Sequence, residues 1–169
     1  MNTTINFVNT YFTEEKIESL FILIIGITSI ILALIFLSII KYSFYKGLAF
    51  PLLIIGIIQL SVGSIIVKRS PKDIIRVEKI IKESPQKIGT EELPRMEKVI
   101  KNFRIYFWIE ILFMLTGIIF FIYFYSSKQT FWKGLGLGLL IQATLLLSLD
   151  LIAKDRAVKF VDQLTKISH

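Results

Sequence analysis

The sequence has no cysteine and a single histidine, His169, which is the last residue given. Without cysteine the chain cannot form disulfides, use a thiol in catalysis or perform disulfide chemistry linked to quinones. A lone histidine at the end offers no histidine relay, metal site or haem ligand within the fold. The acidic residues show no pair spaced for metal binding or acid–base work, apart from a remote combination of Glu110 with Asp150. We therefore expect no enzyme activity, no metal site and no cofactor.

Charged residues are also scarce, at 20% of the 169 residues, whereas 54% are hydrophobic and the mean hydropathy is +0.67. Four stretches have almost no charge: residues 20–40, residues 47–67, residues 105–127 with only Glu110, and residues 134–153 with only Asp150. At about 1.5 Å per residue, each covers roughly the 30 Å hydrocarbon core of a bilayer. The sequence therefore predicts an all-α protein, an integral membrane four-helix bundle with four spans.

Basic residues are distributed unequally between the two sides of these spans. The connections from span 1 to span 2 and from span 3 to span 4 carry four lysines, Lys41, Lys46, Lys128 and Lys133, whereas the other side carries sixteen basic residues. Because basic residues favour the cytoplasmic side, we expect both termini and the middle loop to be cytoplasmic. The net charge of +7 then reflects topology and contact with anionic membrane lipid, and we expect no nucleic-acid binding. The first 16 residues lack a convincing cleavage pattern, so we expect a retained first span rather than a signal peptide.

Two seven-residue stretches are nearly identical, FYKGLAF at residues 44–50 and FWKGLGL at residues 131–137. Both place aromatic rings and a lysine at a membrane interface, where such side chains prefer to lie, beside a glycine that lets the chain turn. A TEE tripeptide at residues 13–15 and again at residues 90–92 is expected to start a helix, with threonine as the cap. The pattern predicts two similar helical hairpins. Duplication and convergence on a common membrane turn both account for it.

The predicted organisation has four parts: a first hairpin (1–67), a cytoplasmic helical connection (68–103), a second hairpin (104–153) and a cytoplasmic C-terminal helix (154–169). Within the connection, SPKD at residues 70–73 has the pattern of a helix start and predicts a helix from Pro71 to about Glu83. Apolar residues at helical spacing predict that spans 3 and 4 continue into the cytoplasm as a stalk. This apolar face comprises Met96, Val99, Phe103, Phe160 and Leu164. These side chains either pack on one another or form a docking surface for a partner protein or a second copy.

Polar side chains inside the spans are costly and are therefore candidates for function. Asp150 lies four residues before Lys154, so an ion pair within one helix is the simplest expectation. Glu110 has no cation at i±3 or i±4 on its own helix, and we expect it to pair with a cation from another helix. The candidates at suitable depth are Lys154, Arg156 and Arg69. A carboxylate that couples to protons or cations is the alternative.

Two glutamines lie deeper, Gln59 in span 2 and Gln142 in span 4. Gly56, Gln59 and Gly63 share one helix face, and Gly134 and Gly138 form a pattern of small residues four positions apart. Both patterns favour close helix packing held by an amide hydrogen bond. A polar path lined by these side chains is the alternative.

The segment GLGLLIQATLLLSLDLIAKDRA, at residues 136–157, resembles small uncharacterised four-span inner-membrane proteins of Bacteroidetes-type bacteria. The resemblance covers mainly spans 3 and 4. It implies a four-helix architecture in a bacterial inner membrane, and it implies no particular activity. Two hypotheses for function stay open. The leading one is a non-enzymatic membrane protein that acts through helix packing and a cytoplasmic partner or self-association, as accessory subunits, sensors and toxin-immunity proteins do. The other is a small oligomeric transporter or channel that uses Glu110, Asp150, Gln59 and Gln142.

Overall fold

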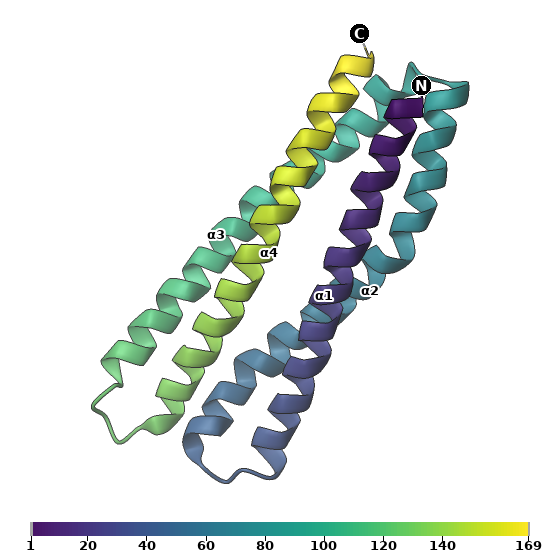
Figure 1. The fold of residues 1–169 in the computed structure, drawn as a ribbon. Coiled ribbons are helices and arrows are strands. Elements are labelled where there is room, and N and C mark those ends of the chain that lie inside the picture. The colour runs from purple at the N-terminus through teal and green to yellow at the C-terminus, as the bar shows by residue number, and fades with distance from the viewer. Residues whose placement is uncertain (1, 169) are drawn as a thin grey trace.

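The computed structural model describes residues 2–168 and consists of four long helices that run up and down the molecule (Figure 1). They are α1 (Asn2–Ser38), α2 (Ser43–Glu83), α3 (Leu93–Tyr123) and α4 (Thr130–Ser168), with a π-helical turn, η1 (Ile88–Glu92), before α3. The described residues contain no strand. The prediction of an all-α four-helix bundle is therefore confirmed. The histidine at position 169 lies outside the described residues.

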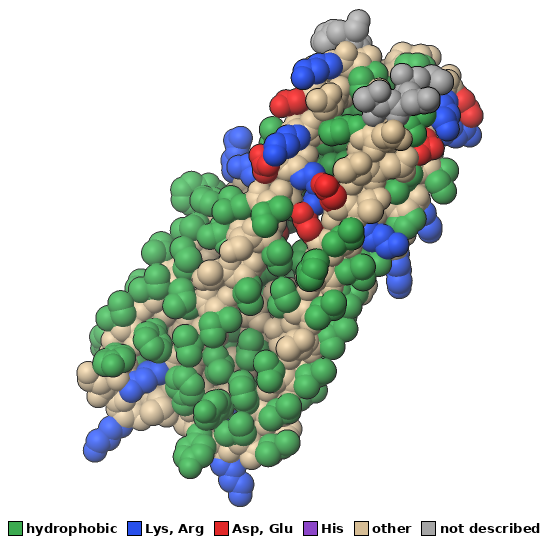
Figure 2. Space-filling view, viewed as in Figure 1, with side chains coloured by type: hydrophobic (Ala, Val, Ile, Leu, Met, Phe, Trp, Pro, Cys, Tyr) green, Lys and Arg blue, Asp and Glu red, His purple; other side chains and the backbone are tan. Residues whose placement is uncertain are grey.

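The molecule has two chemically different ends. We call the end with both termini and residues 84–87 the polar end, and the end with connections 39–42 and 124–129 the turn end. Figure 2 shows apolar side chains over most of the visible surface, acidic and basic side chains together at the polar end, and lysines at the turn end. Each of the four helices contains a stretch long and apolar enough to cross a membrane. These properties support a multi-pass membrane protein, and we call the apolar stretches the membrane-spanning part.

Two predicted helix starts are wrong because the helices begin earlier. Residues 13–15 lie within α1, which begins at Asn2, and α2 runs unbroken through Ser70 and Pro71. Instead of capping a new helix, the Ser70 hydroxyl lies 2.9 Å from the carbonyl oxygen of Ile66 and 3.0 Å from a carboxylate oxygen of Glu15. A proline within a helix removes one backbone hydrogen bond, and α2 changes direction part-way along its length (Figure 1).

The boundaries around α3 also differ from the prediction. Thr90 does not cap a helix, because the π-helical turn already begins at Ile88 and no side chain caps it. At the other end, α3 stops at Tyr123, four residues before the predicted end of span 3. The Phe124 ring stacks on that of Trp132, with ring centroids 5.9 Å apart. Aromatic residues prefer the membrane interface, so this aromatic pair is consistent with a turn at the end of a span.

An apolar core joins all four helices at the polar end. The Phe160 ring of α4 stacks on Tyr11 with centroids 4.0 Å apart, and Phe12 meets it edge-on at 5.7 Å. Further buried members are Val8, Val77, Ile80, Ile81, Ile88, Met96, Ala157 and Leu164. Burial raises the pKa of the Tyr11 phenol well above its ordinary range, so the group stays neutral in this core.

This core corrects the predicted docking surface. Met96, Phe160 and Leu164 are buried in it, and Val99 and Phe103 pack against it. Met96, Phe160 and Leu164 are therefore not accessible to a partner, whereas Val99 and Phe103 are only half-buried. The apolar stripes at the polar end therefore serve the internal packing of the chain, which was the first of the two alternatives.

The two hairpins contact each other mainly through α2 and α4, whereas the backbone of α3 comes close only to those of α4 and η1, and α3 reaches α1 through side chains at the polar end. At the turn end the backbones of α2 and α4 approach very closely at two glycines. A Cβ atom added at Gly47 would lie 1.9 Å from the carbonyl oxygen of Phe131, and one added at Gly134 would lie 1.9 Å from that of Phe44. Gly47 and Gly134 are 87 positions apart in the sequence, and so are Phe44 and Phe131. Equivalent positions of the two similar stretches therefore make reciprocal contacts.

Candidate functional site

Two carboxyl groups line one small pocket inside the membrane-spanning part. Glu110 of α3 is 4% exposed, and Asp150 of α4 lines the same pocket. The second carboxyl oxygen of Glu110, Oε2, is buried and has no hydrogen-bond partner among the described residues. We call Glu110 and Asp150 the acid pair. It lies at the interface between α3 and α4, the long helix whose backbone approaches that of α3.

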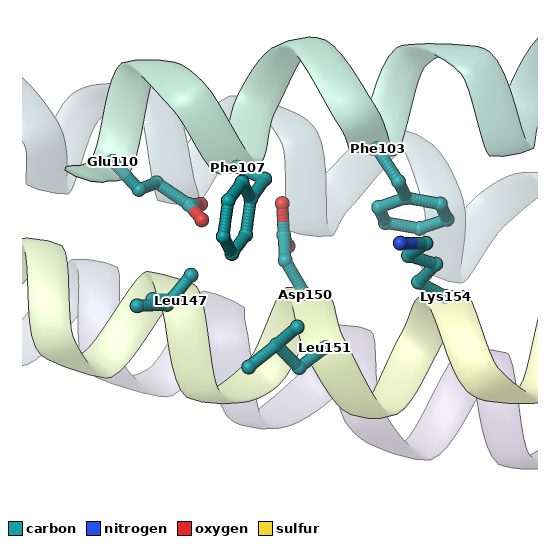
Figure 3. Close-up of a pocket in the computed structure, with 7 residues that line it drawn as sticks. All are labelled: Phe103, Phe107, Glu110, Leu147, Asp150, Leu151 and Lys154. Atoms are coloured by element: carbon teal, nitrogen blue, oxygen red, sulfur yellow. The ribbon is translucent and has the colours of Figure 1, made fainter. Parts of the chain in front are cut away.

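A small pocket surrounds the acid pair (Figure 3). Its volume is about 10 Å³, which is close to the smallest space that holds one water molecule. Phe107 and Leu147 line it beside the carboxyl groups, and Lys154 lines it beneath the Phe103 ring, further toward the polar end. The pocket therefore combines two acids and one amine in apolar surroundings.

The expected cation partners of these acids are elsewhere. Among the described residues, no basic side chain lies within 4.0 Å of Glu110 or Asp150, so neither the predicted Asp150–Lys154 pair nor a Glu110–cation pair is formed. Arg69 pairs instead with a carboxylate of α1 at 2.9 Å, and Arg156 pairs with Glu18 of α1. The two arginines that were expected as possible partners of Glu110, Arg69 and Arg156, therefore pair with acidic residues of α1 at the polar end.

The two glutamines form a separate polar contact. Gln59 of α2 donates a hydrogen bond of 3.0 Å to Gln142 of α4, and Gln142 donates one of 2.8 Å to Ser29 of α1. All three side chains are buried. Gly56 and Gly63 pack closely on α1, because a Cβ atom added at either would lie about 3 Å from a backbone oxygen of that helix. A Cβ atom added at Gly138 would lie equally close to a backbone oxygen of α2. The glutamines therefore join three closely packed helices, on a different interface of α4 from the acid pair.

A chain of alternating charges, which we call the ionic network, lies where the apolar stretches meet the polar end. Its members are Glu15, Arg69, Asp73, Arg76, Glu92 and Arg95, and consecutive members are 2.5–3.2 Å apart. It joins α1, α2, η1 and α3. This network was not predicted from the sequence, although the spacing of Arg69, Asp73 and Arg76 at i, i+4 and i+7 places them on one face of a helix.

Comparison with family models, with curated proteins and with solved structures gives no match to this chain. The resemblance to four-span inner-membrane proteins therefore stays a prediction.

The acid pair offers proton binding and hydrogen bonding as its chemistry. No group of three or more histidine, cysteine or acidic side chains could hold a metal ion in the described residues. Two carboxylates have only acceptor atoms, so a hydrogen bond between Glu110 and Asp150 requires a proton on one of them. Loss of that proton would leave two like charges in contact within apolar surroundings. The acid pair is therefore the group whose chemical state most directly affects the contact between α3 and α4.

Proposed function

We propose that the protein is a small, non-enzymatic, proton-coupled transporter of a bacterial inner membrane, with both termini in the cytoplasm. The observation that carries this proposal is the acid pair, in which Glu110 is buried and Asp150 is half-buried among apolar side chains, without a cation among the described residues within 4.0 Å. Carboxyl groups inside membranes typically mark proton relays in pumps and transporters. The proposal prefers the transport alternative to action through a partner, because three of the five side chains assigned to a partner surface, Met96, Phe160 and Leu164, are buried in the core at the polar end.

The proposed mechanism links proton binding to the packing of α3. With a proton on the acid pair, Glu110 and Asp150 hold α3 against α4 by a hydrogen bond. Without it, electrostatic repulsion between the carboxylates pushes the helices apart or draws the Lys154 amine toward them. Away from the polar end, where Met96 packs against α1, the backbone of α3 approaches only that of α4, so this part of α3 can move relative to α4. The glutamines take no part in this step, since they bond to one another across other interfaces.

Removing either acid is expected to abolish both the shared proton and proton flux. Glu110→Gln and Asp150→Asn should each lose the infrared carbonyl band of a protonated carboxyl in lipid nanodiscs. Vesicles that contain either variant should lose proton uptake driven by a potassium diffusion potential. Asp155→Asn is the matched control, because Asp155 is exposed and pairs with Lys159 on its own helix. A band and a flux that persist in both variants, with normal folding, would show that the acid pair is only structural.

The proposed orientation can be tested directly because the chain has no cysteine. Gln129→Cys places a thiol at the exposed turn end, and Lys98→Cys places one at the exposed polar end. In intact cells, a membrane-impermeant maleimide should label position 129 fully and position 98 only after permeabilisation. Labelling in the opposite order would place the termini outside and overturn the orientation.

A further inference from the structure

An apolar groove opens on the membrane-spanning part between α2, α3 and α4. Its volume is about 240 Å³. It is lined by Phe50, Ile54 and Ile58 of α2, Phe113 of α3, and Leu135 and Leu139 of α4, and it has no polar lining. The groove exists because α2 and α3 both pack on α4 but do not contact each other. It is large compared with the roughly 30 Å³ that one water occupies in the liquid, so it has room for several methylene groups.

The charges near the groove are all of one sign. The sequence has no acidic residue between Glu18 and Asp73 or between Glu110 and Asp150, whereas the turn end carries four lysines. Lys46 is exposed and lies one helical turn before Phe50, on the same side of α2 and nearer the turn end. An apolar groove therefore leads to a positively charged end without any compensating acid.

We propose that this groove binds an acyl chain of an anionic phospholipid whose phosphate lies beside Lys46. Hydrocarbon is the ligand chemistry that suits a lining without hydrogen-bonding groups, because contact with an acyl chain gains dispersion energy and loses no polar contact. The lysine amine attracts the phosphate at the depth where headgroups lie. The site is independent of the acid pair, since the two have no lining residue in common.

The experiment compares lipid retention by native mass spectrometry, using phosphatidylglycerol and phosphatidylcholine with the same acyl chains. The native chain should retain one phosphatidylglycerol after delipidation and release phosphatidylcholine. Ile54→Trp should lose the bound lipid because the indole fills the groove. Ile24→Trp is the matched control, because Ile24 of α1 is exposed to the same extent as Ile54, 57% against 58%, and does not line the groove. Lys46→Gln should lose the preference for phosphatidylglycerol, whereas Lys128→Gln at the other turn should keep it.

Three outcomes would overturn the proposal. Equal lipid retention by Ile54→Trp and Ile24→Trp would show that the groove does not hold the lipid. Equal retention of both lipids by the native chain would show that the site does not select an anionic headgroup. A loss of dimers in Ile54→Trp with unchanged lipid retention would assign the groove to a second copy of the chain.

Discussion

Replacing Glu92 with glutamine is expected to lower the free energy of unfolding by about 3–5 kcal/mol, the usual cost of breaking a buried ion pair by removing one partner. The Glu92 side chain is 0% exposed, and its two carboxylate oxygens lie 2.8 Å from Arg76 and 2.5 Å from Arg95. The substitution keeps the shape of the side chain and removes its charge. Both arginines would then lose their shared anion, and Arg76 would keep only Asp73 as a partner.

The adjacent acid provides the control. Glu91 is 52% exposed and pairs with Lys87 one turn earlier at 3.2 Å, so Glu91→Gln should cost less than about 1 kcal/mol. Unfolding by sodium dodecyl sulfate in mixed micelles, followed by circular dichroism, measures both variants. Equal stabilities of the two variants would show that the ionic network contributes no more than a surface ion pair.

The number and position of the long helices could be predicted from the sequence, because the thickness of hydrocarbon fixes the length of an uncharged span. Local patterns were less informative near Ser70 and Pro71. A serine followed by proline and an acid often starts a helix, but α2 is already helical at this point. The contact between Ser70 and Glu15 of α1 stabilises the continuous helix. Such a contact between helices cannot be found from the spacing within one segment.

The acid pair is a second case in which contacts between helices could not be predicted from spacing within one helix. The sequence identified Glu110 and Asp150 as costly charges within spans, because burial alone makes them so. It assigned them cationic partners, since opposite charges at similar depth are the favourable arrangement. Their actual neighbours depend on the rotation of α3 about its axis, which brings Glu110 to the same pocket as Asp150 (Figure 3). Residue spacing within each helix contains no information about this rotation.

Adding a methyl group at either glycine of the contact between α2 and α4 is expected to destabilise the bundle by about 3 kcal/mol or more, the upper end of the cost of overpacking. The Cβ atom of Gly134→Ala would lie 1.9 Å from the carbonyl oxygen of Phe44 and 2.9 Å from the amide nitrogen of Leu48. These are backbone atoms, so no side-chain rotation relieves the overlap, and the helices must separate. Gly47→Ala should cost the same, because it meets the equivalent atoms of Phe131 and Leu135 at the same distances.

The reciprocal geometry makes a sharper prediction for the double variant. Once one added methyl has separated the helices, the second has part of the space it needs, so the double substitution should cost clearly less than the sum of the two single ones. Ser61→Ala and Thr144→Ala are the controls, since both residues are exposed on the same two helices and bond only to their own helix. The free energy of unfolding in mixed micelles decides between the outcomes. Additive costs would mean that the two glycines pack independently, and costs near those of the controls would mean that the helices do not approach so closely at the turn end.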